Sequence, residues 1–166
     1  MNNKKSSFAP LVEHDSEILI LGSLPGEVSL AAVEYYAHPR NRFWKMLATV
    51  FAEPQPQDYD EKKSLLRRHR VALWDMAKTA FREGSLDSDM SDVIVNEVDK
   101  LIDKHPTIKT VCFNGQKASL LFRQHFTEKE GIVYHTLPST SPANASYSFE
   151  RICNEWGKYL KPSMLQ

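Results

Sequence analysis

A ten-residue stretch of this sequence combines aromatic, cationic and amide side chains. Tyr35 and Tyr36 are adjacent and precede the run HPRNRFW at residues 38–44. Aromatic rings stack on nucleic-acid bases, and neighbouring cations such as Arg40 can meet phosphates. The amide in the run, Asn41, can orient a water molecule or donate an N–H to a base as negative charge builds on it. The stretch points to a nucleic-acid site, and the alternative for Asn41 is an ordinary helix N-cap.

Two further polar segments follow short apolar runs. The turn GSLPG at 22–26 ends the first apolar run, and its backbone N–H groups can approach an anion or a base closely. The segment LPSTSPANAS at 137–146 is a hydroxyl-rich loop, stiffened by proline, that can present donors to a phosphate. Its alternative is the N-cap region of the last helix, with Asn144 or Ser146 as the cap. Neither segment is specific when it is taken alone.

Short apolar runs alternate with helical patterns along the chain. Buried strands are predicted at 17–22, 71–74, 108–113 and 132–137. Helices are predicted at 41–51, 59–69, 92–104, 115–126 and 145–160. This order predicts a three-layer α/β/α fold with a central four-stranded parallel sheet, in one domain of residues 1–166 whose first ten residues form a flexible arm.

Ligands of parallel sheets bind beyond the carboxyl ends of the strands. That rule selects four segments of this chain before any motif is considered. They are residues 23–41, 75–79, 114–117 and 138–144. The tyrosine-rich stretch and the serine-rich loop both fall within this set, so we expect them to meet at one edge of the sheet.

Composition excludes several classes of protein. Hydrophobic residues make up 42% of the chain and charged residues 25%, as in ordinary globular domains. No apolar run approaches the roughly 18 residues that span a membrane. Residues 1–10 lack the apolar stretch of a secretory signal. We therefore expect no membrane association and a cytoplasmic protein, or a nuclear one in a eukaryote.

Metals and cofactors are not expected. Cys112 and Cys153 are too few for an iron–sulfur cluster and should be buried, reduced core residues. The six histidines show no metal-ligand spacing. The glycine patterns that bind dinucleotides or nucleoside triphosphates are missing from the sequence as well.

The charge pattern gives a mixed indication. The net charge is zero, whereas DNA-binding domains are usually basic. Residues 38–45 hold Arg40, Arg42 and Lys45 without an acid, and residues 62–70 hold five Lys or Arg without an acid. The second cluster has the pattern of a solvated helix face, so the first is the candidate DNA contact.

Together these residues resemble a known family. The turn at 22–26, the run at 38–44 and the loop PSTSPAN at 138–144 are similar to the uracil-DNA glycosylase superfamily. The similarity is greatest to its hypoxanthine-DNA (deoxyinosine) glycosylase branch and extends over residues 17–160. Mismatch-specific uracil-DNA glycosylases share the pattern HPxNRFW. The resemblance implies a monomeric DNA-repair enzyme that flips a deaminated base out of the duplex and hydrolyses its N-glycosidic bond.

The sequence departs from the superfamily at two places. Most branches have Asp or Asn at the third position of the first motif, where this chain has Leu24. Leu137 replaces a histidine that often supports the leaving base. The hypoxanthine branch is similar in lacking the first-motif amide, and the resemblance transfers its catalytic role to Asn41.

The same resemblance suggests roles for residues around the base. Phe43 matches the ring that stacks on a flipped base, and Gly22, Ser23 and Leu24 would also contact the base. Asp75 ends the second strand. Its carboxylate would accept the ring N–H that deamination creates and repel the bare ring nitrogen of adenine or cytosine. Its alternative is a helix cap or a salt bridge.

The remaining expected contacts are with the DNA backbone and the base stack. Phosphate contacts are expected from Ser23, Arg40, Ser139, Thr140 and Ser141. Pro142, Ala143 and Asn144 lie where family members push a wedge into the duplex, but this chain lacks a bulky wedge side chain there. No lysine is placed as an obvious Schiff-base nucleophile, so a glycosylase without lyase activity is expected.

Two rival functions remain open at this point. The replacements at Leu24 and Leu137 are compatible with a non-catalytic binder of damaged DNA or nucleotides. An unrelated hydrolase could use Ser139 or Ser141 with His38 or His135, although the sequence has no G-x-S-x-G elbow.

Overall fold

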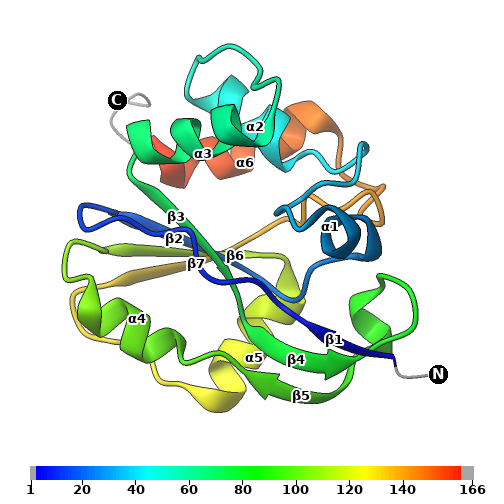
Figure 1. Ribbon diagram of the computed structural model, residues 1–166. Coiled ribbons are helices and arrows are strands. Elements are labelled where there is room, and N and C mark those ends of the chain that lie inside the picture. The colour runs from blue at the N-terminus through cyan, green and yellow to red at the C-terminus, as the bar shows by residue number, and fades with distance from the viewer. Residues whose placement is uncertain (1–2, 162–166) are drawn as a thin grey trace.

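The computed structural model describes residues 3–161 and contains the predicted parallel sheet at its centre (Figure 1). Four strands run in the order β3-β2-β6-β7, and each neighbouring pair is parallel. The strands are β2 (Ile18–Gly22), β3 (Val71–Asp75), β6 (Thr110–Asn114) and β7 (Val133–Leu137). Because the strands are parallel, the segments that follow them meet at one edge of the sheet.

Helices cover both faces of this sheet. On one face lie α2 (Phe43–Val50), α3 (Tyr59–Arg68) and α6 (Phe149–Leu160); on the other lie α4 (Val98–Lys104) and α5 (Gln116–His125) (Figure 1). Alternation along β2 explains the two cores, because Ile20 packs with the first set of helices and Leu19 and Leu21 with the second. The predicted three-layer α/β/α fold is confirmed.

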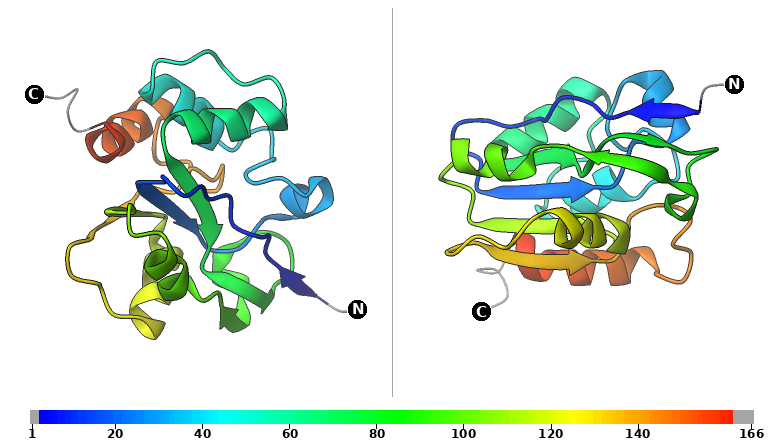
Figure 2. Two further views of the ribbon diagram at one scale, coloured as in Figure 1. Left: turned by 60° about the vertical axis from the view of Figure 1, so that its left-hand side comes forward. Right: turned by 90° about the horizontal axis from the view of Figure 1, so that it is seen from below.

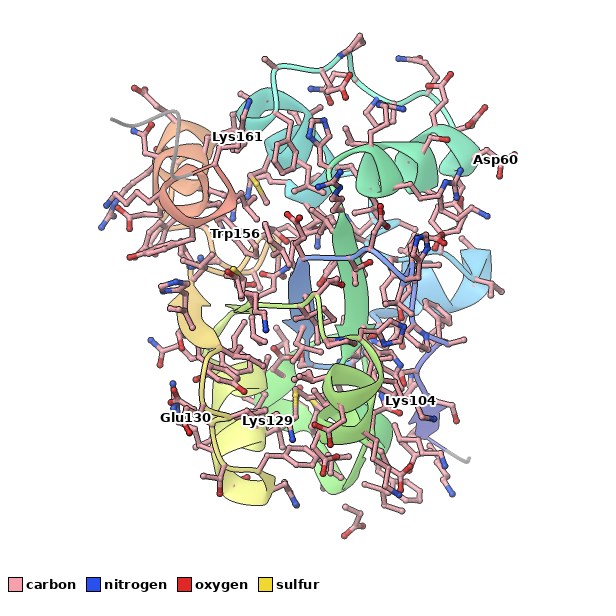
Figure 3. The ribbon with its side chains drawn as sticks, turned by 90° about the vertical axis from the view of Figure 1, so that its left-hand side faces the viewer. Asp60, Lys104, Lys129, Glu130, Trp156 and Lys161 are labelled. Atoms are coloured by element: carbon pink, nitrogen blue, oxygen red, sulfur yellow. The ribbon has the colours of Figure 1, made fainter. Side chains whose placement is uncertain are left out.

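The largest fully buried side chain belongs to α6. Trp156 lies on the side of α6 that faces the sheet (Figure 3), and its indole N–H donates to the carbonyl of Pro138 at 2.9 Å. Since Pro138 directly follows β7, this bond ties the last helix to the loop at the carboxyl edge. The hydrogen bond also satisfies a polar group that would otherwise be costly to bury.

A second, smaller sheet was not anticipated. It is antiparallel, in the order β1-β4-β5 (Figure 2), and comprises β1 (Lys4–Ser6), β4 (Ala77–Phe81) and β5 (Ser91–Val95). The prediction of a flexible arm at residues 1–10 is therefore wrong for Lys4–Ser6, which pair with β4. Residues 1–2 of that predicted arm lie outside the described part of the chain.

The predicted helix at 92–104 is wrong in its first half, where the chain forms strand β5 before α4 begins. Residues Val93 to Val95 are all β-branched and pair with β4, so the helix begins at Val98. Ile94, expected on the buried helix face, is 58% exposed. A short 3₁₀ turn at Asp87–Asp89 and the helix α1 (Glu27–Ala32) complete the elements of residues 3–161.

The last helix also begins later than predicted. Its N-cap is Ser148, whose hydroxyl accepts the N–H of Arg151 at 3.1 Å. Asn144 and Ser146 are therefore not caps of α6. The amide of Asn144 instead donates to the carbonyl of Ser139 at 3.0 Å, inside the loop.

Asn96 joins the two sheets at the end of β3. Its buried amide donates to the carbonyl of Asp75 at 2.7 Å and to that of Ala77 at 3.3 Å, and it also reaches the hydroxyl of Ser7 at 3.1 Å. Backbone carbonyls at this point need a partner, because the chain leaves the parallel sheet here and enters the antiparallel one.

Replacing Asn96 by alanine should therefore destabilise the protein. We expect Asn96→Ala to lower the free energy of unfolding by about 1–3 kcal/mol, because it leaves buried carbonyls unpaired. Urea unfolding followed by circular dichroism measures this. Asn3→Ala is the control, since it removes a bond to Glu83 that is exposed, and should change stability by less than about 0.5 kcal/mol. Equal effects of the two variants would show that Asn96 does not hold this junction.

Candidate active site

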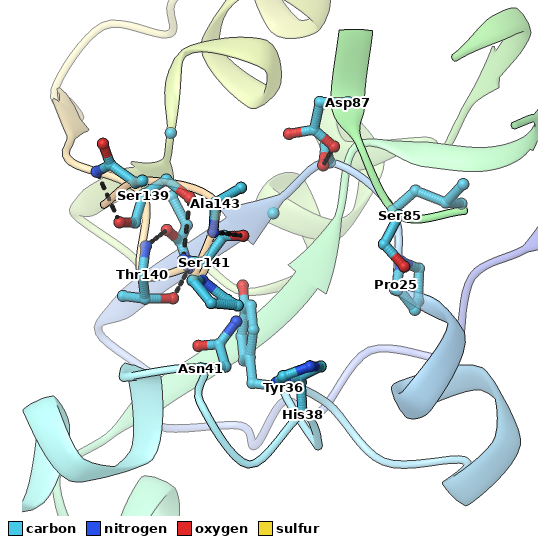
Figure 4. Close-up of a pocket in the computed structure, with 18 of the residues that line it drawn as sticks. Pro25, Tyr36, His38, Asn41, Ser85, Asp87, Ser139, Thr140, Ser141 and Ala143 are labelled. Atoms are coloured by element: carbon cyan, nitrogen blue, oxygen red, sulfur yellow. Dashed lines mark hydrogen bonds between the residues drawn. The ribbon is translucent and has the colours of Figure 1, made fainter. Parts of the chain in front are cut away.

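A cavity of about 580 Å³ opens at the carboxyl edge of the parallel sheet (Figure 4). All four strand ends contribute to it, as the parallel topology requires. The predicted site residues that line it are Gly22, Ser23, Leu24, Asn41, Asp75 and the loop residues Ser139, Thr140, Ser141, Pro142, Ala143 and Asn144. Arg40 and Phe43 are not among the lining residues.

One wall of the cavity was not predicted. It comes from the connection between β4 and β5, which contributes Ser85, Leu86 and Asp87. Figure 4 shows Ser85 and Pro25 on one side of the cavity and the serine-rich loop on the other. The hydroxyl of Ser85 accepts the N–H of Glu27 at 3.0 Å, which fastens this wall to the start of α1. The residues of this connection carry no motif that marks them in the sequence as part of a site.

The floor of the cavity is formed where β2 and β3 end side by side. Gly22 is paired with Asp75 in the sheet. A Cβ on Gly22 would lie 2.6 Å from Oδ1 of Asp75 and 2.9 Å from the hydroxyl oxygen of Tyr36. Those distances are too short for any side chain, so glycine at this position is what allows the two polar groups to approach the strand.

Asp75 is an ionisable group that is buried away from solvent. It is 3% exposed, and its Oδ2 is buried without a hydrogen-bond partner. Burial, and secondarily the charge of Asp87, raises the pKa of Asp75 to about 7, although the nearby cation Arg82 acts in the opposite direction. The alternatives of a helix cap or a salt bridge for Asp75 do not occur among residues 3–161. The carboxyl thus changes charge near neutral pH.

A buried arginine braces the cavity wall beside Asp75. Arg82 donates to the carbonyl of Gly84 at 3.0 Å and to that of Pro25, and its Nη1 lies 3.8 Å from Oδ1 of Asp87. Asp87 in turn accepts the hydroxyl proton of Ser23 at 2.6 Å. The hydroxyl hydrogen of Ser23 is therefore directed at Asp87, and only its oxygen lone pairs remain for a ligand.

Leu24 follows Ser23 into the wall. It is buried, lies at the edge of the cavity, and packs in a small cluster with Ala77 and Ala80 of β4. At the motif position where most of the resembled family has an amide or a carboxylate, the side chain is thus an apolar part of the wall and holds no water.

Of the two packed rings Tyr36 and Phe43, Tyr36 lines the cavity and Phe43 does not. Phe43 is 0% exposed and lies in the core, with its ring centroid 4.1 Å from that of Tyr36 and 5.0 Å from that of Trp44. A base could stack on Phe43 only if Tyr36 moved. Two adjacent tyrosines were noted in the sequence, but spacing alone does not show which ring turns toward the sheet edge.

Asn41 lies in the cavity lining and also bonds to the backbone at the start of α2. The N-cap residue of α2 is Arg42, so Asn41 precedes the cap, but its Oδ1 accepts the N–H of Phe43 at 3.0 Å as a cap side chain would. Within the described residues its Nδ2 has no partner. This cap-like bond and a role in the cavity are compatible, because they use different atoms of one amide. Figure 4 places Asn41 next to Tyr36 and His38.

The serine-rich loop presents two hydroxyls and hides a third. Ser139 accepts the N–H of Ser141 at 3.2 Å, and Ser141 accepts that of Ala143 at 3.1 Å. Each of these hydroxyls keeps its own proton for a ligand. Thr140 is 0% exposed and exchanges two 3.0 Å bonds with the side chain of Asn114. The expected phosphate contact through the Thr140 hydroxyl does not fit this geometry.

A serine hydrolase arrangement does not form. Among the described residues, neither Ser139 nor Ser141 bonds to a histidine. His135 is stacked on Tyr159 with centroids 3.8 Å apart, and Nδ1 of His38 accepts the N–H of Arg40 at 3.0 Å. The nucleophile and base that such chemistry requires are not in contact.

Arg42 holds the serine-rich loop in place. Its guanidinium donates to the carbonyls of Ser141 and Asn144, each at 3.0 Å, and to that of Tyr147. Its backbone N–H also donates to the carbonyl of Thr140 at 3.1 Å. The sequence suggested a phosphate contact for the cations of this run, but the donors of Arg42 are used on the loop itself.

Comparison with known proteins identifies the family. The model of a family described as the uracil DNA glycosylase superfamily matches residues 9–161. The chain belongs to this superfamily. Within residues 3–161, no helix of this glycosylase-superfamily protein is both long and apolar enough to cross a membrane.

Two relatives and one solved structure show how far the similarity extends. A hypoxanthine DNA glycosylase of Methanosarcina barkeri is 41% identical over 116 residues, which cover 69% of this chain and 73% of that protein. One of Methanosarcina acetivorans is 37% identical over 155 residues, 92% of this chain and 95% of that protein. The solution NMR structure of a candidate uracil DNA glycosylase from M. acetivorans is 35% identical, with a TM-score of 0.81 and coverage of 96% and 98%.

Removing the donors of Arg42 should loosen the loop of this superfamily member. We expect Arg42→Met to lower the free energy of unfolding by about 2–4 kcal/mol, because several carbonyls lose a charged donor. Amide exchange in residues 141–147 should accelerate more than in the central strands. Arg40→Met is the control, since the Arg40 side chain is exposed, and it should change neither quantity appreciably. Protection of the loop in Arg42→Met would contradict the assignment.

The buried carboxyl of Asp75 should make stability depend on pH. Below about pH 4 this carboxyl is protonated in both states, whereas between pH 4 and 7 the unfolded chain ionises it and the fold resists ionisation. Stability should therefore fall as pH rises through this window and level off above pH 7.

Asp75→Asn removes the ionisation and tests that pH dependence. We expect the variant to gain stability at pH 8 by up to about 4 kcal/mol, at roughly 1.4 kcal/mol per pH unit between the two pKa values, and to gain little at pH 4. Urea unfolding at both pH values measures it. The exposed Asp89→Asn makes the same charge change as a control. An equal gain at both pH values would mean that Asp75 titrates normally.

Proposed function

We propose that this protein is a monofunctional DNA glycosylase that removes hypoxanthine from DNA, and uracil or xanthine as further substrates, and that it acts as a monomer. The observation that carries the proposal is Asp75, a buried carboxylate with an unpaired oxygen at the floor of a cavity. Deamination of adenine turns the ring nitrogen N1 from an acceptor into an N–H donor. An ionised carboxylate accepts from that donor and is repelled by the bare nitrogen of adenine.

The relatives support this choice of base. Two proteins named hypoxanthine DNA glycosylase match this chain at 41% and 37% identity. The cavity is also built within one chain from the described residues, so it is complete without a second copy. The rival interpretation of a non-catalytic binder has no comparable support.

The surroundings of the cavity suit DNA as the ligand. We propose that the hydroxyls of Ser139 and Ser141 donate to phosphates, with the exposed side chain of Arg40 contacting the DNA backbone nearby. Ser23 contributes through its oxygen and backbone. The segment Pro142, Ala143 and Asn144 then lies at the gap that the flipped base leaves, and its small side chains make it a weak wedge.

The bond-breaking step needs a positioned polar group near the sugar. Water adds to C1′ as the C1′–N bond breaks, the electron pair of that bond leaves with the base, and the proton that the water loses ends on the released base. We propose that Asn41 uses its Nδ2 to donate a hydrogen bond to the departing base as charge builds on it, while its Oδ1 stays on the helix. No lysine lines the cavity in the described chain, so no amine is placed for a Schiff base and strand cleavage is not expected.

Base release is tested on a duplex oligonucleotide that carries one deoxyinosine. We expect alkali-dependent strand breaks after incubation and none without alkali, because the product is an abasic site. Matched duplexes with uracil, xanthine or adenine rank the substrates, and adenine should be inert. The proposal fails if none of the deaminated bases is released at an enzyme excess.

Asn41→Asp separates the two uses of this residue. Aspartate caps a helix as well as asparagine does but cannot donate, so stability should stay within about 0.5 kcal/mol while the single-turnover rate falls by about 10²–10³. Asn41→Ala should lose the same rate and also about 1 kcal/mol of stability. A wild-type rate in Asn41→Asp would leave Asn41 with the cap role alone.

A further inference from the structure

Two buried polar atoms at the cavity floor lack partners. In residues 3–161, four buried side-chain polar atoms are without a hydrogen bond, on Tyr36, Asp75, Thr79 and Arg82. Of these residues, Tyr36 and Asp75 line the cavity, whereas Thr79 and Arg82 do not. An unpaired buried polar group is costly to the fold, so each one needs an explanation, and beside a cavity a ligand can supply the missing bond.

The two atoms belong to neighbouring groups of opposite character. The unpaired oxygen of Asp75 is Oδ2. The other carboxylate oxygen, Oδ1, and the hydroxyl oxygen of Tyr36 lie 2.6 and 2.9 Å from the same point above Gly22, so the carboxylate and the phenol are neighbours. Burial, and secondarily the charge of Asp75, raises the pKa of Tyr36 well above its usual range, although the nearby side chain of Asn114 acts in the opposite direction. The phenol therefore stays protonated and can donate. The ionised carboxylate beside it can only accept. The floor therefore offers one donor next to one acceptor.

We propose that Tyr36 and Asp75 together recognise the lactam edge of a deaminated base, with the Tyr36 hydroxyl donating to the ring carbonyl and the Asp75 carboxylate accepting the adjacent N–H. This proposal rests on the function proposed above and deepens it. Hypoxanthine and xanthine carry this edge at C6 and N1, and uracil carries it at C4 and N3. One pair of protein groups thus accounts for acceptance of all three bases.

The same pair discriminates against adenine and cytosine. Both bases present a bare ring nitrogen to the Asp75 acceptor, so that contact fails, and an amino group replaces the carbonyl to which Tyr36 would donate, so the phenol could only turn to accept from it. Sites that must hydrogen-bond a polar group reject analogues lacking it by as much as 10⁴–10⁵. Guanine shares the lactam edge and is not excluded by these two groups; its pairing with cytosine opposes flipping instead.

Tyr36→Phe isolates the hydroxyl from the ring. The ring of Tyr36 packs on Phe43, and a phenylalanine at position 36 keeps that contact. A stacking role would therefore survive the change, whereas the proposed donor would be lost. Removing an unpaired buried hydroxyl should leave the thermal midpoint unchanged or raised, so the variant should fold.

The test measures binding as well as base release. Duplexes with 2′-fluoro-deoxyinosine or 2′-fluoro-deoxyadenosine resist cleavage, because the fluorine disfavours positive charge on the sugar, so they report recognition alone. We expect wild-type protein to bind the inosine duplex more tightly than the adenosine duplex. In Tyr36→Phe the ratio of the two dissociation constants should shrink by about 10- to 100-fold. Single-turnover release of hypoxanthine and uracil should fall by a similar factor for both bases. Tyr134→Phe, whose hydroxyl accepts the N–H of Lys129, is the control and should match wild type.

The outcomes separate this inference from the proposed function. A preference in Tyr36→Phe within twofold of wild type, on a folded protein, overturns the lactam pair and leaves the glycosylase intact. Preference for inosine without base release in wild type overturns the glycosylase and supports the pair. Asp75→Asn gives a second check, because its amide can donate to N1 of adenine and should narrow the preference for inosine over adenine. An unchanged ratio in Asp75→Asn would also overturn the pair.

Discussion

The close approach of two strand ends at Gly22 governs the site. A carboxyl group is held against the backbone of the neighbouring strand, where any side chain on residue 22 would collide with it. Asp75 is thereby buried away from solvent with one oxygen unpaired, and burial, with the charge of Asp87, raises its pKa to about 7. The protein thus maintains a group that opposes folding when ionised. Such a group is understandable at a place where a ligand, rather than the fold, supplies the partner.

The rest of the architecture keeps that floor open and correctly shaped. Asn96 fixes the backbone at the end of β3, and Arg82 braces the wall beside it. Two side chains hold the serine-rich loop on the opposite side. Arg42 bonds to Ser141, which is 99 positions further along the chain, and Asn114 bonds to Thr140, which is 26 positions further. Arg42 donates to backbone carbonyls of the loop, and Asn114 bonds to the hydroxyl and N–H of Thr140, so the loop can present Ser139 and Ser141 without collapsing into the cavity. The site is therefore held by polar contacts around a buried floor.

The sequence predicted the parallel strands and the helices because the spacing of apolar residues reflects which face of each element is buried. Apolar runs located all four parallel strands to within two residues, and the strand-end rule placed Asn41 and Asp75 at one edge. The second sheet escaped prediction, since β1 has three residues and β5 shares a segment whose Ile94 also fits a helical spacing. The sequence could not show whether Tyr36 or Phe43 lines the cavity. Tyr36 adopts a left-handed backbone conformation (φ 54°), which no pattern of non-glycine residues predicts. Arg82 was hidden for a similar reason: only the fold shows that an arginine in a polar connection is buried.

Direct titration of Asp75 tests the account most sharply. The carboxyl carbon of this residue can be followed by NMR against pH in the free protein and in complex with a duplex that carries 2′-fluoro-deoxyinosine. We predict a pKa near 7 in the free protein and a clear decrease in the complex, because an N–H donated by the base stabilises the ionised form. A pKa that rises or stays unchanged on binding would contradict the claim that this carboxylate accepts a hydrogen bond from the ring N–H that deamination creates.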